Sequence, residues 1–469
     1  MTPEIVDYAA RTAALPLMLI AAALLILLVP LFVRPLRGAQ GLIAVGALLA
    51  LPVFLRRPQP VQLDLFGGAL VLNPLTSYVW LFALAVLALV VLLSVAGSPA
   101  PEESRGEYYF LLFTATVGLM ALVAAGDLFT AFIALELLSL PVYALAGIRR
   151  SKPGLEAAYK YFMLGAFGSG MTVMGIAVLN ALYPALTFAA LKGGSPQPLA
   201  LAGFLLVISG FAFKTALVPF HMWVPDAYEG APTQISAFMG AAVKAGGVIV
   251  LWRLFSLFDA GTVHRVFWWL AAVTMVAANL MALAQKGLKR LLAYSSVAHA
   301  GYLATAFFGG RAGLEAILYY LPVYAMATIG AFAVAAALEK GEKGPQIDDL
   351  AGLARARPWL AGAMAAFMFS LAGVPPLAGF FAKFYAFAGA VSAGYTSLVI
   401  VAVLMSAVSM YYYLKVTVAM YMKPAPAEAS YGAPGLAEIV IFLMAAGVLA
   451  AGVLSRPLLA MAAKAAAGF

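Results

Sequence analysis

Apolar residues fill most of the chain in runs long enough to cross a lipid bilayer. A helix of roughly 20 residues spans a hydrocarbon core of about 30 Å, and short polar segments separate runs near this length. The pattern predicts fourteen helices, near residues 12–33, 41–55, 76–96, 108–125, 127–147, 155–182, 200–228, 233–257, 266–285, 291–308, 314–338, 358–391, 394–421 and 436–454. We therefore expect an all-α polytopic membrane protein.

Few residues remain for structure outside these helices. The first run follows a polar segment with Glu4, Asp7 and Arg11 and lacks a small-residue cleavage site, so we expect a retained helix and not a signal peptide. Between Arg56 and Leu75 the alternation around Gly67-Gly68 predicts a β-hairpin. No soluble domain is expected.

Composition supports the membrane class and narrows the chemistry. Hydrophobic residues make up 65% of the chain and charged residues 10%, whereas soluble domains are about 45–50% apolar and about 25% charged. Without any Cys, the chain can hold neither a disulfide nor a Cys-ligated iron–sulfur cluster, and three His offer few metal ligands. Redox chemistry would therefore have to lie in a partner.

The net charge of +9 does not indicate a nucleic-acid partner, because most basic residues lie in short turns between apolar runs. With an even number of helices, both termini lie on one side of the membrane. Fourteen Lys and Arg residues fall on the opposite side and nine on the terminal side. Because cytoplasmic loops are enriched in basic residues, both termini are expected to face the periplasm.

Two segments of the chain resemble one another. Phe211 to His221 and Phe367 to Leu377 both place Val-Pro inside an apolar run, and Pro219 and Pro375 lie 156 residues apart. A similar offset relates the fourth to eighth helices to the ninth to thirteenth. An odd number of helices per unit makes the two units inverted repeats, with breaks at Pro219 and at Pro375-Pro376, and such breaks mark ion pathways in transporters. The expected divisions are residues 1–107, 108–257, 258–421 and 422–469.

Five ionisable residues fall deep inside the apolar runs, where a charge costs at least about 2.5–3.5 kcal/mol. They are Glu136, Lys214, Lys244, His299 and Lys383. Each has a structural alternative: a neutral or hydrogen-bonded residue in the core, or, for Lys383, a side chain that reaches the nearer surface. Together they suit proton transfer, since burial and a nearby carboxylate shift a lysine pKa in opposite directions.

We expect Glu136 and Lys214 to load and release a proton, which Lys244 and His299 would relay to Lys383. Tyr294, Ser295, Ser296 and Tyr302 flank His299 and could carry protons. Whether Lys160, His221 and Lys415 take part is left open. We favour surface positions for Lys160 and Lys415. His221 and Asp226 are expected to have a structural role, and His264 and Glu438 are expected to lie near helix ends. The chain has neither a P-loop nor a Rossmann glycine motif, so the driving energy must come from outside.

These features resemble the antiporter-like membrane subunits of respiratory complex I and Mrp cation/proton antiporters. The resemblance covers almost the whole chain, and the strings Leu135 to Leu145, Phe213 to Thr233 and Lys289 to Tyr302 resemble the subunit N type. Lys383 stands where the M type is expected to carry Glu. The L type is expected to extend into a lateral helix, whereas this chain ends at Phe469.

The resemblance implies a proton-translocating subunit of NADH:quinone oxidoreductase in a bacterial inner membrane, with Glu136, Lys214, Lys244, His299 and Lys383 in the proton channel. It implies no cofactor in this chain, and places FMN, iron–sulfur clusters and quinone in partner subunits. The other partners would be antiporter-like paralogues and lipid. Alternatives are a subunit of an Mrp-type antiporter or membrane-bound hydrogenase, a structural subunit without proton flux, and a free-standing solute transporter.

Overall fold

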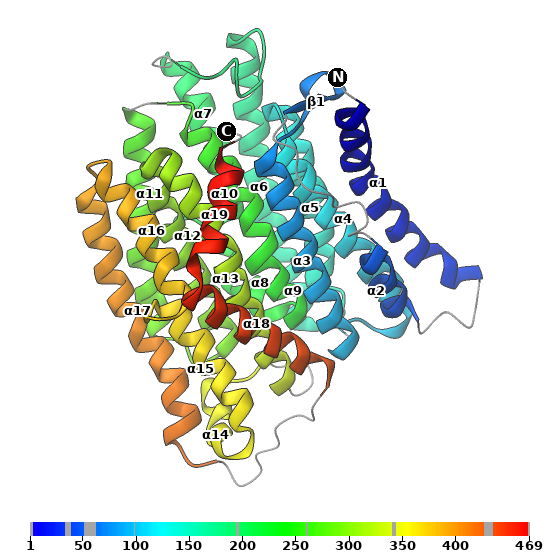
Figure 1. The fold of residues 1–469 in the computed structure, drawn as a ribbon, viewed down its shortest axis with the longest axis vertical. Coiled ribbons are helices and arrows are strands. Elements are labelled where there is room, and N and C mark those ends of the chain that lie inside the picture. Colours follow the sequence, from blue (N-terminus) through cyan, green and yellow to red (C-terminus); the bar gives the residue numbers. More distant parts are fainter. Residues whose placement is uncertain are drawn as a thin grey trace.

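The chain folds into a bundle of long helices, seen in a computed structural model that describes residues 3–32, 39–50, 62–97, 99–193, 197–258, 261–339, 344–425 and 435–467. The last residues of the expected helix 41–55 and several loops lie outside these ranges. Both ends of the described chain lie at one end of the bundle, which we call the terminal end, and α14 lies at the opposite end (Figure 1).

Helices account for nearly all of the described residues, as the apolar runs predict. They are α1 (Pro3–Phe32), α2 (Gln40–Ala50), α3 (Pro74–Gly97), α4 (Arg105–Ala124), α5 (Leu128–Ala146), α6 (Lys152–Leu182), α7 (Pro198–Thr215), α8 (Trp223–Gly230), α9 (Thr233–Phe238), α10 (Lys244–Phe255), α11 (Thr262–Leu283), α12 (Leu288–Ala306), α13 (Gly310–Leu338), α14 (Leu353–Ala356), α15 (Pro358–Ala372), α16 (Ala378–Ser392), α17 (Thr396–Met422), α18 (Leu436–Val453) and α19 (Ser455–Ala466).

Ten helical stretches in the described part of the chain are long and apolar enough to cross a membrane. One of them, Leu288–Leu338, contains both α12 and α13, which meet at a 3-10 turn at Phe307–Gly309. Ala14–Val29 and Pro358–Ala372 form shorter apolar helices. The class of a multi-helix membrane protein is therefore confirmed by length and composition.

Three helical regions are interrupted. The expected helix 200–228 is divided into α7 and α8, and the expected helix 358–391 into α15 and α16, so both Pro-containing breaks are confirmed. A π-helical segment, Met239–Val243 (η5), separates α9 from α10 and was not expected from the sequence. The short helix α19 was also missed.

The β-hairpin is confirmed. Strands β1 (Leu63–Leu65) and β2 (Leu70–Leu72) pair antiparallel, with Leu63 opposite Leu72. Gly67 and Gly68 form the turn with φ of 66° and 90°, a backbone region that residues with a Cβ rarely adopt. The hairpin lies at the terminal end beside the start of α1 (Figure 1).

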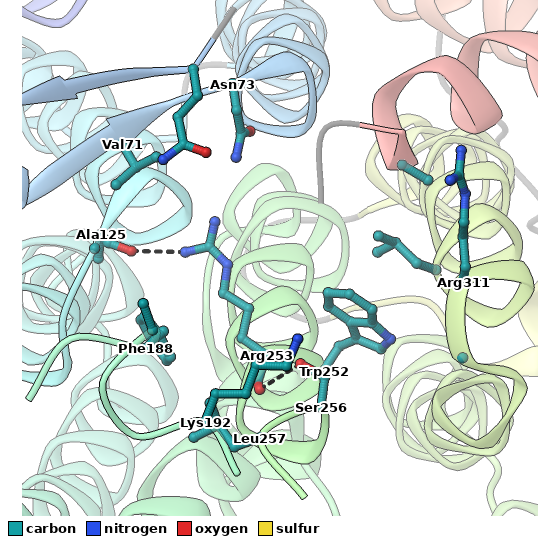
Figure 2. Close-up of a pocket in the computed structure, with 16 residues that line it drawn as sticks. Val71, Asn73, Ala125, Phe188, Lys192, Trp252, Arg253, Ser256, Leu257 and Arg311 are labelled. Carbon is teal, nitrogen blue, oxygen red and sulfur yellow. Dashed lines mark hydrogen bonds between the residues drawn. The ribbon is translucent and has the colours of Figure 1, made fainter. Parts of the chain in front are cut away.

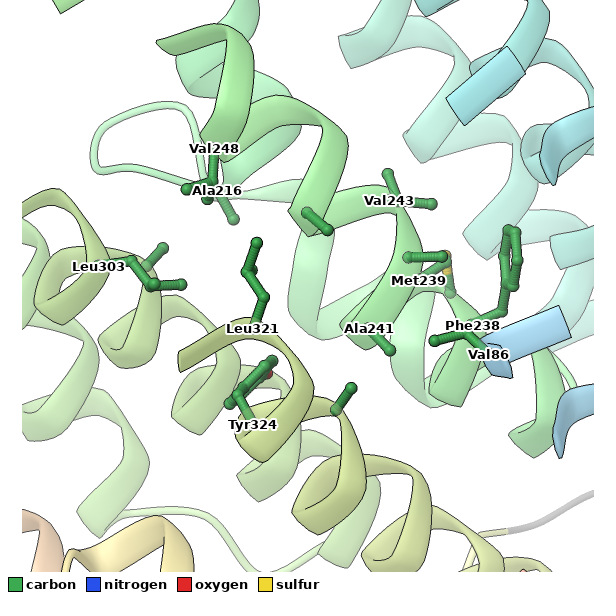
Figure 3. Packing of buried hydrophobic residues seen from close by; sticks show 14 of the residues in the cluster. Val86, Ala216, Phe238, Met239, Ala241, Val243, Val248, Leu303, Leu321 and Tyr324 are labelled. Carbon is green, nitrogen blue, oxygen red and sulfur yellow. The ribbon is translucent and has the colours of Figure 1, made fainter. Parts of the chain in front are cut away.

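The centre of the bundle is formed by the interrupted helix α9–η5–α10 together with α12 and α13. All residues from Thr233 to Phe255 are buried, as is every residue of α12 except Arg290. Large and small apolar side chains alternate around η5, where Met239 and Phe238 lie on the side of Val86 from α3, and Leu321 and Tyr324 reach in from α13 (Figure 3). A fully buried helix in a membrane protein contacts protein on all sides, so its polar residues are shielded from lipid.

A cavity of about 580 Å³ opens among segments at the terminal end (Figure 2). Its lining comes from β2, the turn between α4 and α5, the loop after α6, the end of α10, the start of α13 and the end of α19. Among the described residues, its lining includes none of the five candidate proton-transfer residues.

Close packing of α4 on α5 leads to a stability prediction. A Cβ on Gly118 would lie 2.3 Å from the backbone nitrogen of Leu138, whereas a Cβ on Gly170 of α6 has nothing within 4 Å. Overpacking typically costs about 1–3 kcal/mol. We expect Gly118→Ala to lower the thermal unfolding midpoint of the detergent-solubilised protein, followed by intrinsic fluorescence, and Gly170→Ala to leave it unchanged. Equal midpoints for both variants would contradict this packing.

Candidate functional site

The first break holds Lys214 in the last turn of α7. The helix ends in a pair of reverse hydrogen bonds, from Leu217 N–H to the Ala212 carbonyl and from Ala216 N–H to the Phe213 carbonyl, with Ala216 at a φ of 65°. This is the Schellman arrangement that ends many helices. It stops α7 in the apolar interior and leaves the Lys214 side chain buried, with 3% of its surface exposed.

Among the described residues, tyrosines and no carboxylate form hydrogen bonds with the Lys214 ammonium. Its Nζ donates to the hydroxyl of Tyr143 at 3.0 Å and of Tyr161 at 3.4 Å. The same atom lies 4.5 Å and 4.8 Å from the centres of these two rings, and ring faces attract cations electrostatically. Tyr143 fits here because residue 165 is glycine: a Cβ there would lie 2.0 Å from the Tyr143 hydroxyl.

Glu136 lies on the same helix as Tyr143, seven residues earlier and therefore about 10 Å away along the axis. It is half-buried, and Ser169 of α6 donates to its Oε1 at 2.5 Å. Its neighbours Ile133 and Leu140 are more than half exposed, so this carboxyl group faces the outer surface of α5. Within the described residues no direct ion pair joins Glu136 to Lys214.

The π-helical segment determines the direction of Lys244, the first residue of α10. An i→i+5 turn adds a residue to the helix and changes which side chains face a given neighbour. Lys244 is 2% exposed, and its Nζ contacts both the main-chain carbonyl and the hydroxyl of Ser296 in α12. It also lies 5.1 Å from the centre of the Tyr324 ring. The contact between Lys244 and Ser296 joins the two central helices.

His299 lies three residues after Ser296 and is enclosed by tyrosines. Its Nδ1 lies 2.7 Å from the Tyr320 hydroxyl and its Nε2 3.3 Å from the Tyr413 hydroxyl. The Tyr413 hydroxyl also contacts Ser295 at 2.5 Å. Of the flanking residues proposed from the sequence, Ser295 and Ser296 join this network. Tyr302 packs edge-on to the imidazole, and Tyr294 has no side-chain hydrogen bond within the described chain.

Lys383 completes the series at the second break. It is 5% exposed, so the alternative of a side chain that reaches the surface is wrong. Its Nζ donates to the Ala372 carbonyl at 2.9 Å and to the Ser406 hydroxyl at 2.8 Å, and lies 4.7 Å from the centre of the Tyr302 ring. Because Ala372 is the last residue of α15, its carbonyl has no partner within the helix. Lys383 supplies a donor to it.

The two breaks have the same hydrogen-bond pattern, which corrects their alignment. Val374 N–H donates to the Phe369 carbonyl and Gly373 N–H to the Ser370 carbonyl, each 157 residues after its counterpart at the first break. This offset pairs Pro219 with Pro376, whereas the sequence comparison had paired Pro219 with Pro375. The adjacent prolines of the second break made the two alignments indistinguishable by sequence.

Between Lys214 and Lys244 the connection is aromatic. Tyr161 stacks on Trp223 with ring centres 4.1 Å apart, and Trp223 meets Tyr228 edge-on at 6.2 Å. The Tyr228 hydroxyl then lies 3.4 Å from Ser296 Oγ, which contacts Lys244. The indole nitrogen of Trp223 donates to the Phe213 carbonyl. Among the described side chains, these ring contacts leave the hydrogen-bonded route between the two lysines incomplete.

Five further residues that the sequence analysis singled out have identifiable positions and partners. Lys160 is 43% exposed and pairs with Glu156 and Asp226, while Lys415 donates to the Gln285 carbonyl at 2.8 Å. His221 lies in the break before α8. His264 stacks on Phe255 near the terminal end, and Glu438 pairs with Arg357. Outside the helices that span the membrane, Lys423 donates to Asp348 and holds the pKa of that carboxyl below its ordinary value.

Sequence reasoning missed a buried cluster near the opposite end. Lys289 is 2% exposed and donates to the Ala231 carbonyl at 2.7 Å, although its position in a basic string suggested a loop. Arg149 pairs with Glu339 at 3.0 Å, and Thr233 donates to the other oxygen of this carboxylate at 2.9 Å. The tyrosines around Lys214 and His299 were also missed. Their contacts come from helices far apart in sequence, so only the fold reveals them.

The described residues contain no group of three or more His, Asp or Glu placed to hold a metal ion. What they bring together is a series of four ionisable side chains, Lys214, Lys244, His299 and Lys383, linked mostly by hydroxyl groups and helix carbonyls. Glu136 lies at one end of the series, near the outer surface. Such an arrangement of amines, imidazole and hydroxyl groups can hold and transfer protons.

Comparison with known proteins agrees with this geometry. The model of the family described as "NADH:quinone oxidoreductase/Mrp antiporter, TM" matches residues 125–409. This chain therefore belongs to that family of membrane subunits. A relative from Trichlorobacter lovleyi, 42% identical over 413 residues that make up 85% of either chain, carries the name NADH-quinone oxidoreductase subunit N.

Solved structures show the same architecture. A chain of respiratory complex I from Thermus thermophilus with bound aureothin is 34% identical, has a TM-score of 0.83, and is matched over 96% of this chain and 99% of its own length. A chain of the Mrp complex from Dietzia sp. gives a TM-score of 0.85 at 22% identity, over 100% of this chain and 97% of its own. The second likeness shows the fold alone.

Burial of the lysines predicts their chemical reactivity. A buried amine reacts with a reagent only when the structure around it opens locally. We expect amidination of the native protein by methyl acetimidate, mapped by mass spectrometry, to modify Lys214, Lys244 and Lys383 at least about tenfold more slowly than exposed Lys152 at the start of α6. Similar rates at all four positions would show that the lysines are accessible, contrary to the structure.

Proposed function

We propose that this chain is a proton-translocating membrane-arm subunit, of the N type, of a proton-pumping NADH:quinone oxidoreductase. The observation that carries the proposal is the series of buried lysines and a histidine, contacted by hydroxyls and carbonyls, in a chain whose relatives are named subunit N. No redox group is assigned to the chain itself. Its part in the enzyme is to move protons when redox chemistry elsewhere drives it.

We assign the entry of a proton to Glu136, Tyr143 and Lys214. A buried ammonium group that contacts hydroxyls and ring faces is stabilised less than one paired with a carboxylate, so its charged and neutral forms lie closer in free energy. A movement that brings the Glu136 carboxylate closer favours the charged lysine, and withdrawal favours release of the proton. Tyr143, which donates or accepts through one hydroxyl, lies on the same face of α5 as Glu136 and can link the two.

Transfer from Lys214 to Lys244 is proposed as the controlled step. The rings of Tyr161, Trp223 and Tyr228 separate the two lysines, and an indole N–H already bonded to a carbonyl cannot pass a proton on. Water or a side-chain movement must complete the route. A gap that opens only in one state of the enzyme would prevent protons from leaking back.

From Lys244 the proposed route continues through hydroxyl groups. Lys244 contacts Ser296, and adjacent Ser295 contacts Tyr413, which lies 3.3 Å from His299. Imidazole can take a proton on one nitrogen and release it from the other. Lys383, held on the far side of Tyr302, is the proposed exit toward the other side of the membrane.

The proposed topology has fourteen membrane crossings, with α7–α8, α9–η5–α10 and α15–α16 each counted as one. The matching ends of α7 and α15 support inverted repeats at residues 108–257 and 258–421, flanked by residues 1–107 and 422–469. Both ends of the described chain lie at the same end of the bundle, which supports an even number of membrane crossings. We propose a bacterial inner membrane with both termini on the periplasmic side.

Partners follow from the same proposal. FMN, iron–sulfur clusters and quinone are assigned to other subunits, since this chain has no Cys to hold a cluster. The exposed apolar side chains of α5 and α6 around Glu136, among them Ile133, Leu140 and Phe167, are proposed to contact an antiporter-like paralogue. Lipid would cover the remaining outer faces.

A second candidate keeps the fold and changes the assembly. The likeness to a chain of an Mrp complex is consistent with a subunit of a cation/proton antiporter or a membrane-bound hydrogenase. Purification of the assembly from native membranes separates these cases. NADH-driven quinone reduction with co-purifying flavin and iron–sulfur absorbance supports the leading proposal, whereas sodium-dependent exchange or co-purifying nickel would replace it.

Removal of the entry groups tests the proton route. We expect Glu136→Gln and Lys214→Ala to lower NADH-driven proton translocation in the assembled enzyme roughly tenfold or more, because groups that transfer protons contribute on this scale or above. Translocation is measured with a pH-sensitive dye in membrane vesicles. Glu156→Gln and Lys152→Ala, which remove the same charges at the surface, should have little effect.

The same variants distinguish a structural subunit. If this chain only supports assembly, Glu136→Gln and Lys214→Ala reduce the amount of assembled enzyme but not the protons moved per NADH. Unchanged stoichiometry and unchanged coupled turnover in both variants would remove the channel assignment. Each result is therefore normalised to the amount of assembled enzyme in the vesicles.

The hydroxyl of Tyr413 provides a separate test of the second half of the route. Tyr413→Phe keeps the ring but removes the group between Ser295 and His299, so we expect translocation to fall by a factor on the order of 10. Tyr411→Phe is the matched control, because Tyr411 on the same helix is 64% exposed. Equal translocation by the two variants would exclude Tyr413 from the route.

A further inference from the structure

The cavity at the terminal end, which we call the terminal cavity, has no part in the proton series. Its lining joins segments far apart in sequence, from Asn73 at the start of α3 to Ala466 at the end of α19 (Figure 2). Arg253 in its wall lies nine residues after Lys244 on α10, or about 13 Å along the helix axis. Its volume of about 580 Å³ lies within the range of about 300–1,000 Å³ for small-molecule sites.

Three cationic side chains line the terminal cavity. Arg253 is only 4% exposed; its Nη1 donates to the Ala125 carbonyl at 2.8 Å, and its guanidinium carbon lies 5.6 Å from the centre of the Phe188 ring. Lys192 and Arg311 lie nearer the surface. Among the described residues the lining includes neither Asp nor Glu. Arg311 also pairs at 3.5 Å with Glu315, which is not in the lining; the two side chains are 65% and 29% exposed.

Other donors face the same space. The Oδ1 atom of Asn73 accepts from Thr76 N–H at 2.9 Å, which leaves the amide NH₂ as the group that Asn73 presents beside Arg253 (Figure 2). Helices α3 and α13 begin at this rim, whereas α4, α10 and α19 end beside it, so the helix ends contribute partial charges of both signs. The positive field therefore comes from the three cations. The terminal cavity is therefore a place of positive potential.

The lining also has a large apolar share. Val71, Phe188, Trp252, Leu257 and Leu314 form much of the wall. Several cations in a partly apolar hollow repel one another, and the cost is reduced when an anion enters. Arginine favours phosphate and carboxylate because its planar donors match two oxygens at once.

We propose that the terminal cavity binds a phosphate-bearing anion, with Arg253, Lys192 and Arg311 on its oxygens and Asn73 as an additional donor. The phosphate can belong to a lipid headgroup, whose glycerol and acyl carbons would lie against Phe188, Trp252 and Leu257, or to a free phosphate. Both sources share the same recognition by arginine and lysine. A bound anion would join six separate chain segments at this end of the bundle.

A lipid headgroup is tested by photolabelling. The assembled enzyme is purified with mild detergent, incubated with phosphatidylglycerol that carries a diazirine near its headgroup, and irradiated. We expect labelled peptides to include residues 186–192 or 252–257. Arg253→Gln should reduce this labelling at least about tenfold, the loss expected when a charge-assisted contact is removed. Labelling of the exposed face of α17 around Ile400 and Leu404, which is assigned to lipid, serves as the internal reference.

Two further variants guard against general damage. Arg253 also binds the Ala125 carbonyl, so its replacement can disturb the fold. The double variant Lys192→Gln/Arg311→Gln leaves that bond in place, and we expect it to lower labelling of the cavity peptides severalfold. Arg265→Gln removes an exposed positive charge near the start of α11, outside the cavity lining, and should label like the parent protein.

A free phosphate is tested by protection of Lys192. Inorganic phosphate at millimolar concentration should slow amidination of Lys192 relative to Lys152 in the delipidated enzyme, and Arg253→Gln should abolish the protection. Photolabelling that depends on Arg253 assigns the site to lipid, and protection without photolabelling assigns it to free phosphate. If neither photolabelling nor protection changes in Arg253→Gln or in the double variant Lys192→Gln/Arg311→Gln, the terminal cavity is not an anion site.

Discussion

The bond between a buried cation and a main-chain carbonyl is the interaction on which the interior of this protein depends. Four buried cationic side chains make such a bond: Lys244 with Ser296, Arg253 with Ala125, Lys289 with Ala231 and Lys383 with Ala372; the half-buried Lys415 makes the same kind of bond with Gln285. Four of these carbonyls lie at or just beyond the end of a helix, where the helix itself offers no donor. The lipid hydrocarbon offers no hydrogen-bond donor either. These cationic side chains, although unfavourable to bury, therefore supply hydrogen bonds that the backbone carbonyls need.

A carbonyl partner has a different effect from a carboxylate partner. It accepts a hydrogen bond from a lysine in either protonation state, and it leaves no unpaired negative charge when the lysine becomes neutral. Lys244 and Lys383 can therefore exchange a proton without the loss of a buried ion pair. Among the described residues Lys214 contacts tyrosines and makes no bond to a carbonyl. This difference suits it to respond to a neighbouring subunit.

The sequence predicted the scaffold well, because the apolar runs and the Val-Pro strings are local signals. Glu136 and the buried residues Lys214, Lys244, His299 and Lys383 were all found by their position inside such runs. The partners of these residues could not be found in this way, since Tyr143, Tyr161 and Tyr413 reach them from other helices. Nor could the π-helical segment, whose residues Met239 to Val243 read as ordinary helix. Lys289 was predicted to lie in a loop because, in the sequence alone, a charged residue near a helix end is expected to be exposed.

The π-helical segment changes which neighbours the side chains of one membrane helix face before and after it. Successive residues of an α-helix are rotated by about 100° about its axis. One additional residue therefore rotates all later side chains by that angle relative to the earlier ones. Thr233, before the segment, binds Glu339 at the opposite end, while Lys244, after it, faces Ser296. The two halves can thus pack against different neighbours. A shift of the π-helical turn along the helix would change the direction of the Lys244 side chain without moving either end of the helix.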